Sequence, residues 1–189
     1  MMKYALEELD AFNIAFYRIL IGMIFINLID FKKTSFSLRQ HFELSMVGLL
    51  WMSFPFYLFA KAEETITSSL AGLINGSTPI FISLVAVLIF KNKITKKQII
   101  YLFTGFVGIY FVSFGFSNAF NELNLGALLA LLASVSYGFA ANIVQPLIKE
   151  HGSLKTLKIA LRYATMISLV LLIVNSGPSL PTYNISLFP

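Results

Sequence analysis

Polar and small side chains form a stripe along one face of the apolar segment Ile66–Phe90. At about 100° per residue, the members of this stripe fall within about 100° of arc; they are Ser68, Gly72, Asn75, Gly76, Pro79 and Ser83. The Asn75 amide can both donate and accept hydrogen bonds. Pro79 lacks a backbone N–H, so a kink there would free the carbonyl of Asn75. Such groups could bind a small solute, and packing against a neighbouring helix is the alternative for Asn75 and Pro79.

A second apolar segment, Leu125–Ile148, carries small and polar residues at every fourth position. Residues four apart lie on the same face of a helix; these are Ala130, Ser134, Gly138 and Asn142. Tyr137 lies beside this face. We predict that Tyr137 and Asn142 line a cavity, and helix packing is again the alternative for both.

Glycines recur on the helical faces of several apolar segments. Small residues allow the backbone of another helix to approach closely. We therefore interpret one set of glycines as packing positions: Gly72, Gly76, Gly105, Gly108, Gly115 and Gly138. Gly72 and Gly76 have the spacing of four residues that is typical of such contacts.

Six long apolar stretches dominate the chain and have to position these residues. They are Phe12–Ile29, Leu44–Ala60, Ile66–Phe90, Gln98–Ser117, Leu125–Ile148 and Leu157–Val174. Only 12% of the residues are charged, against about 25% in a soluble domain. A helix of about 20 apolar residues spans a bilayer, and backbone groups in lipid have to pair within their own segment. The sequence therefore predicts an all-α membrane protein, a polytopic helical bundle surrounded by the lipid bilayer.

Basic residues are concentrated in alternate loops between these stretches. The loops 32–41, 91–97 and 149–158 hold ten Lys and Arg residues, whereas the other loops and the terminal segments hold only Lys3 and Lys61. Cytoplasmic loops retain Lys and Arg. We therefore predict that these three loops are cytoplasmic and that both ends of the chain lie outside. The net charge of +5 follows from this bias and does not indicate nucleic-acid binding.

The apolar stretches lack the residue types that catalysis and metal binding use most. The chain contains no Cys, and the stretches contain no acidic residue and no His. His41 and His151 lie in loops, apart in the sequence. Without a carboxylate pair or a His or Cys cluster, the stretches offer no ordinary acid–base pair or metal site. We predict no catalytic residue, no metal and no cofactor.

Arg18 is a charge roughly 9 Å inside its apolar stretch, and an intramembrane charge is by default a functional hypothesis. Arg18 could contact an anionic group of a solute; snorkelling to the interface is the alternative. A matching arginine, Arg162, occupies the fourth position of IALRYATMISLVLLI (159–173), as Arg18 does in AFYRILIGMIFINLI (15–29). The two copies would have opposite membrane orientations, which is the pattern of an inverted-topology repeat.

Three sequence patterns follow one another in the middle of the chain. A nearly continuous pair of helices covers residues 54–90, with the pattern Leu-Ala-Gly…Asn…Thr-Pro at 70–79. The short basic turn KNKIT (91–95) then leads to a helix with paired glycines. Together these patterns resemble the EamA group of the drug/metabolite transporter superfamily. GALLALLASVSYGFAANIVQPLI (126–148) looks like the helix that opens the family's second half, and FYRILIGM (16–23) looks like its Arg-bearing second helix.

The resemblance implies ten helices in two halves, of which the six here would be the second to the seventh. Residues 1–117 would form the first repeat without its first helix, and residues 124–189 the start of the second repeat. It also implies a permease that moves a small metabolite or drug-like molecule across the plasma (inner) membrane by alternating access, in the direction of export. Two alternatives stay open: a membrane-embedded enzyme acting on a lipid, and a non-transporting accessory subunit. The resemblance assigns no substrate and no oligomeric state.

Overall fold

The structure is a computed structural model that describes residues 11–29, 35–114 and 124–176. Its helices are α2 (Ala11–Asn27), α3 (Leu38–Val47), η1 (Gly48–Ser53), α4 (Phe54–Glu63), α5 (Ser68–Gly76), α6 (Thr78–Leu88), α7 (Lys96–Phe114), α8 (Leu125–His151) and α9 (Ser153–Ser176). The π-helical turn η1 joins α3 and α4 into one rod. No strand occurs in these ranges, and the predicted all-α bundle is confirmed.

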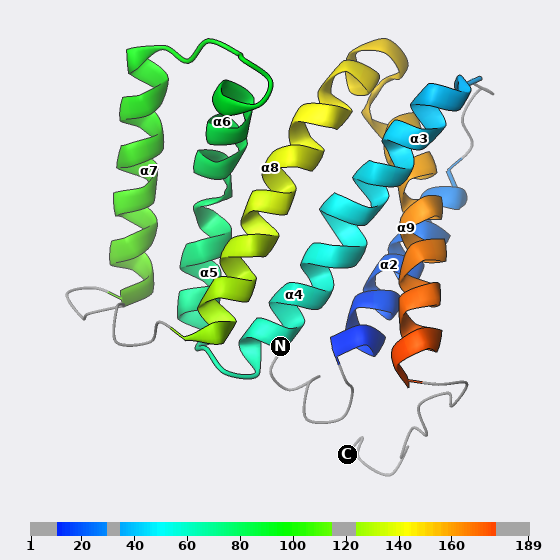
Figure 1. The fold of residues 1–189 in the computed structure, drawn as a ribbon, viewed down its shortest axis with the longest axis horizontal. Coiled ribbons are helices and arrows are strands. Elements are labelled where there is room, and N and C mark those ends of the chain that lie inside the picture. The colour runs from blue at the N-terminus through cyan, green and yellow to red at the C-terminus, as the bar shows by residue number, and fades with distance from the viewer. Residues whose placement is uncertain (1–10, 30–34, 115–123, 177–189) are drawn as a thin grey trace.

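Each predicted apolar stretch corresponds to one helical rod, and successive rods run in opposite directions through the bundle (Figure 1). Four rods are long and apolar enough to cross a membrane: Leu38–Glu63, Ser68–Leu88, Leu125–His151 and Ser153–Asn175. Helix α2 is shorter, with 17 residues, which corresponds to about 26 Å of helix. Helix α7 has 19 residues. The second rod is longer than the sequence predicted, because it begins at Leu38 rather than Leu44.

Side-chain caps define where several helices begin. Ser37 accepts a hydrogen bond from the Gln40 amide at 3.3 Å, and the Gln40 side chain accepts one from the Ser37 amide, which makes a capping box. Asn124 caps α8 with its side chain, which accepts a hydrogen bond from the amide of Ala127. The Asn124 side chain also donates to the carbonyl of Thr65 at 2.9 Å. The start of α8 is thereby attached to the turn between α4 and α5.

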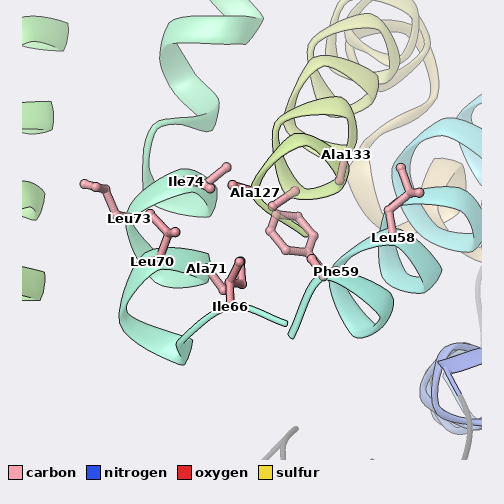
Figure 2. Close-up of a cluster of buried hydrophobic side chains, with 11 residues drawn as sticks. Leu58, Phe59, Ile66, Leu70, Ala71, Leu73, Ile74, Ala127 and Ala133 are labelled. Atoms are coloured by element: carbon pink, nitrogen blue, oxygen red, sulfur yellow. The ribbon is translucent and has the colours of Figure 1, made fainter. Parts of the chain in front are cut away.

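The largest buried cluster lies where α4, α5 and α8 meet (Figure 2). It includes Leu58 and Phe59 of α4 and Leu70 and Ile74 of α5, and the Phe59 ring lies between α5 and α8. Helix α8 contributes small residues: Ala127, Ala130 and Ala133. Because these side chains are short, the three helices can approach closely. The apolar face of α5 is therefore buried, and its polar face points away from the core.

Helix α9 packs against α2 and against the π-helical turn η1. A Cβ on Gly48 of η1 would lie 2.8 Å from the carbonyl oxygen of Ala160 and 2.8 Å from the amide nitrogen of Ala164. Ser53, which is buried, donates a hydrogen bond to the Ala164 carbonyl at 3.0 Å. The absence of a side chain at Gly48 and the small side chain at Ala164 thus allow α9 to contact η1 through its backbone.

Gly138 of α8 has a similarly close neighbour in α6, and this contact predicts the effect of a substitution. A Cβ on Gly138 would lie 2.9 Å from the Phe81 carbonyl oxygen and 2.9 Å from a methyl group of Val85. We expect Gly138→Ala to lower the free energy of unfolding in detergent by about 1–3 kcal/mol, since α6 would have to move.

Gly105→Ala is the matched control, because a Cβ on Gly105 meets nothing within 4 Å. This variant should be neutral or up to about 1 kcal/mol more stable, since alanine favours the helix. Equal destabilisation by the two substitutions would contradict the close contact between α6 and α8.

Candidate functional site

A polar cavity of about 240 Å³ lies between α2, α4, α5 and α8. We call it the Arg18 cavity. Four of the candidate residues predicted from the sequence line it together: Arg18, Ser68, Asn75 and Tyr137. They come from three helices that are distant in the sequence. The remaining lining residues are Phe56, Phe59, Glu63, Ala71 and Gly72.

Opposite charges line this cavity. The Arg18 guanidinium lies 4.5 Å from the centre of the Phe56 ring, a distance at which the face of the ring attracts a cation. Glu63, at the end of α4, is half-buried and accepts a hydrogen bond from the Ser68 hydroxyl at 3.5 Å. A cation, a carboxylate, an amide and two hydroxyl groups therefore share one small space. Such a set can hold a polar solute in a fixed orientation.

Aromatic rings form another wall of the Arg18 cavity. Phe59 and Tyr137 stack with their ring centres 6.1 Å apart, and both line the cavity. Phe59 also belongs to the buried cluster of α4, α5 and α8. Because Phe59 is packed in that cluster, the buried core positions the ring against which Tyr137 stacks.

Gly72 has a different environment from the one that the sequence predicts. It lines the Arg18 cavity and is exposed, and a Cβ built on it meets nothing within 4 Å. Gly72 therefore has no close helix neighbour among the described residues, and its role in packing stays a prediction. Its neighbours Asn75 and Ser68 on the same face are also exposed. The polar face of α5 borders the cavity rather than another helix.

The other predicted glycines divide into two groups. A Cβ on Gly105 or on Gly108 meets nothing within 4 Å, so these two glycines have no close helix neighbour among the described residues. Gly138 contacts α6 closely, as described above, and Gly76 is the last residue of α5. Gly115 lies outside the described residues.

Ser83 and Asn142 line a second cavity, of about 410 Å³, between α6, α7, α8 and the turn that contains Lys93. We call it the Lys93 cavity. The Asn142 amide donates to the carbonyl of Ile82 at 3.1 Å and to that of Gly138 at 2.8 Å. It thereby joins α8 to α6. The seven predicted candidates thus do not form one site.

Pro79 lines neither cavity and lies in the first turn of α6, just after the break between α5 and α6. The break is centred on Ser77, whose hydroxyl donates to the Ile74 carbonyl at 2.6 Å. Ser134 of α8 donates to the same carbonyl at 3.3 Å. The hydroxyl groups of Ser77 and Ser134 thus both donate to the carbonyl of Ile74. The sequence predicted instead that the carbonyl of Asn75 would be free to accept a hydrogen bond. Near the break, the hydroxyl oxygen of Thr78 is buried and has no hydrogen-bond partner in the described structure.

Two features of this site could not be read from the sequence. In the sequence, Glu63 and Glu64 lie just before the start of the next helix, where helix capping accounts for both residues. Only the fold shows that Glu63, the last residue of α4, borders a cavity. Phe56 and Phe59 are ordinary apolar residues of α4 until Arg18 is placed beside them. No group of three His, Cys, Asp or Glu residues that could hold a metal occurs in the part of the chain that the structure describes.

The basic residues gather at one end of the bundle. The start of α3, the turn between α6 and α7 and the junction of α8 with α9 all lie at this end (Figure 1). These segments carry Arg39, Lys91, Lys93, Lys96, Lys97, Lys149, Lys155 and Lys158. Lys61 lies toward the opposite end of the bundle and pairs with Glu64 at 2.7 Å. We call the first end the lysine-rich end.

A model of the EamA-like transporter family matches residues 1–114. The chain belongs to this family. The resemblance noted in the sequence is thereby confirmed, and the EamA-like protein is an integral, multi-pass membrane protein of the transporter type. The match includes every residue of the Arg18 cavity except Tyr137. No curated protein and no solved structure matches the chain.

Proposed function

We propose that this EamA-like protein is a permease that moves a small polar metabolite across the plasma (inner) membrane by alternating access, in the direction of export. The Arg18 cavity is the observation that carries the proposal. Its Arg18, Asn75 and Tyr137 come from three different helices and converge on one space of about 240 Å³. Relative movement of these helices would therefore open or close the site.

The exposure pattern of α5 supports this function over simple helix packing. Leu70 and Ile74 are buried on one face, whereas Ser68, Gly72 and Asn75 are exposed on the other. A polar group that faces hydrocarbon without a partner is costly. A face of this kind is better explained by contact with a hydrated solute or a water-filled path.

The proposal is tested with the protein reconstituted into liposomes loaded with a defined mixture of amino acids, nucleosides, organic acids and sugars. At least one of these solutes should leave the vesicles faster than it leaves protein-free vesicles, as measured by mass spectrometry of the external medium. Asn75→Leu should reduce this difference several-fold. Release of every solute at the protein-free rate would contradict the proposal.

An enzyme acting on a lipid and a non-transporting subunit are the other classes that the sequence left open. The EamA-like family is a transporter family, which favours transport over both. A lipid-modifying enzyme would change the composition of the vesicles during the same experiment, and a non-transporting subunit would change neither the lipid nor the solute. The liposome experiment therefore separates the three classes.

We further propose that the chain is built from inverted repeats, residues 1–117 and 124–189. Helices α2 and α9 pack together and run in opposite directions (Figure 1), which supports this arrangement. Their arginines differ in partner, since Arg162 donates to the Asn27 side chain at 2.7 Å whereas Arg18 lies over Phe56. Only the first arginine lines the Arg18 cavity.

The break between α5 and α6 predicts a hinge next to the cavity. Pro79→Ala would supply the missing N–H and make a continuous helix more favourable. We expect this variant to lower the maximal rate of transport several-fold with little change in the concentration for half-maximal rate, since conformational steps often limit turnover. Rates measured over a range of solute concentrations check this. A change confined to the half-maximal concentration would show that Pro79 affects binding instead.

Orientation can be tested directly, because the chain has no native Cys. We propose that the lysine-rich end is cytoplasmic. Single cysteines at Ser37, Asn92 and Ser153 should then be protected from an impermeant thiol reagent in intact cells and should react after permeabilisation. A cysteine at Thr65, at the opposite end, should react in intact cells. The reverse labelling pattern would overturn this orientation.

A further inference from the structure

The Lys93 cavity continues into an apolar groove between α6 and α7. This groove has a volume of about 370 Å³, and it shares four lining residues with the Lys93 cavity: Ser83, Val87, Ile94 and Leu102. Except for Ser83, the residues that line the groove are apolar. A polar space and an apolar space therefore adjoin each other along the same pair of helices.

The polar part lies at the lysine-rich end of the bundle. Lys93, Asn92 and Gln98 line it from the α6–α7 turn and the start of α7, and Gln145 lines it from α8. Residues 91–97 contain four lysines and no acidic residue. Amide N–H groups and ammonium groups are donors that suit the oxygens of a phosphate. The charge of this part of the cavity thus favours an anionic ligand.

We propose that the Lys93 cavity and the adjoining groove bind one anionic phospholipid from the leaflet at the lysine-rich end. The phosphate lies near Lys93 and Asn92, and one acyl chain lies in the groove between Leu84 and Phe103. A soluble anion would use the polar part but would leave the apolar groove without a ligand. A zwitterionic lipid would fill the groove without matching the positive charge. This assignment is independent of the solute proposed for the Arg18 cavity.

The single tryptophan, Trp51, allows a direct test by fluorescence quenching. It lines neither the Lys93 cavity nor the groove, so Trp51→Phe gives a background without tryptophan. Phe103→Trp then reports from the groove, which Phe103 lines with 68% of its surface exposed. Val170→Trp, at a residue of α9 that is 59% exposed, reports from an exposed position that does not line the groove.

The protein is reconstituted into vesicles with phosphatidylglycerol and phosphatidylcholine, only one of which carries brominated acyl chains. Brominated phosphatidylglycerol should quench the tryptophan at position 103 more than brominated phosphatidylcholine does at the same mole fraction. The tryptophan at position 170 should be quenched equally by both lipids. Lys93→Gln should lower the relative binding constant for the anionic lipid about fivefold at position 103, since one lysine near a membrane contributes on that scale.

Lys155→Gln is the matched control, because Lys155 lies at the same end of the bundle but lines neither the cavity nor the groove. This variant should retain the preference. Equal quenching by the two lipids at position 103, or equal losses in the two lysine variants, would overturn the proposal. Relief of the quenching by millimolar inorganic phosphate would also overturn it, because the polar part would then bind a soluble anion.

Discussion

Arg18→Gln is expected to lower the rate of solute transport about 10- to 100-fold. A hydrogen bond to a charged group contributes about 1.5–3 kcal/mol, which corresponds to that range of rates when the contact is lost in the rate-limiting complex. The guanidinium lines the Arg18 cavity, and Arg18 is an exposed residue. Initial rates in liposomes, normalised to the amount of folded protein, measure the effect.

Arg162→Gln is the control for this prediction. Arg162 is the matching arginine on α9, where it donates to Asn27 at 2.7 Å and lies outside the Arg18 cavity. Its replacement should change the thermal stability of the protein in detergent more than the rate per folded molecule. If Arg18→Gln reduced only the amount of folded protein, Arg18 would be a structural residue that snorkels to the interface.

Asn75→Leu should reduce transport at least about fivefold while leaving membrane insertion intact. The side chain lies on the exposed face of α5 and lines the Arg18 cavity, and one hydrogen bond lost from a bound solute costs about 1 kcal/mol or more. Leucine is close in size to asparagine and is compatible with a membrane helix. Transport rate and the yield of monodisperse protein after membrane extraction are the two measurements.

Leu88→Ala provides the comparison, because Leu88 lies on the same rod but at the end of α6 and is 65% exposed. It should change neither the rate nor the yield by much. Normal transport by Asn75→Leu together with a defect in Leu88→Ala would place the solute path elsewhere on this rod.

The helical rods could be predicted from the sequence because each depends on a local property. An apolar stretch in lipid has to satisfy its own backbone hydrogen bonds, and a helix does so without help from other segments. The polar face of α5 could also be predicted from the local sequence, because Ser68, Gly72 and Asn75 follow the helical period. What could not be predicted was which distant residues this face meets, because the neighbours Arg18 and Tyr137 depend on how α2 and α8 pack.

Details of the backbone also depended on packing rather than on local pattern. Pro79 indicated a kink, yet the break is centred on Ser77, where Ser134 of α8 satisfies the Ile74 carbonyl from outside the rod. Gly105 and Gly108 share a face, yet neither meets another helix there among the residues that the structure describes. Small residues permit a close contact but do not create one, so a glycine pattern alone could not tell Gly138 from Gly105.

The π-helical turn Gly48–Ser53 sets the rotational register between the two halves of its rod. Helix α3 precedes this turn and packs on α8 and α9, whereas α4 follows it and carries Phe56 and Glu63 to the Arg18 cavity. Removal of one residue from the turn would rotate α4 by about 100° relative to α3. Phe56 and Glu63 would then leave the cavity even though every residue that lines it was still present. A length change of one residue, far from Arg18 in the sequence, could thus separate the two charges of the site.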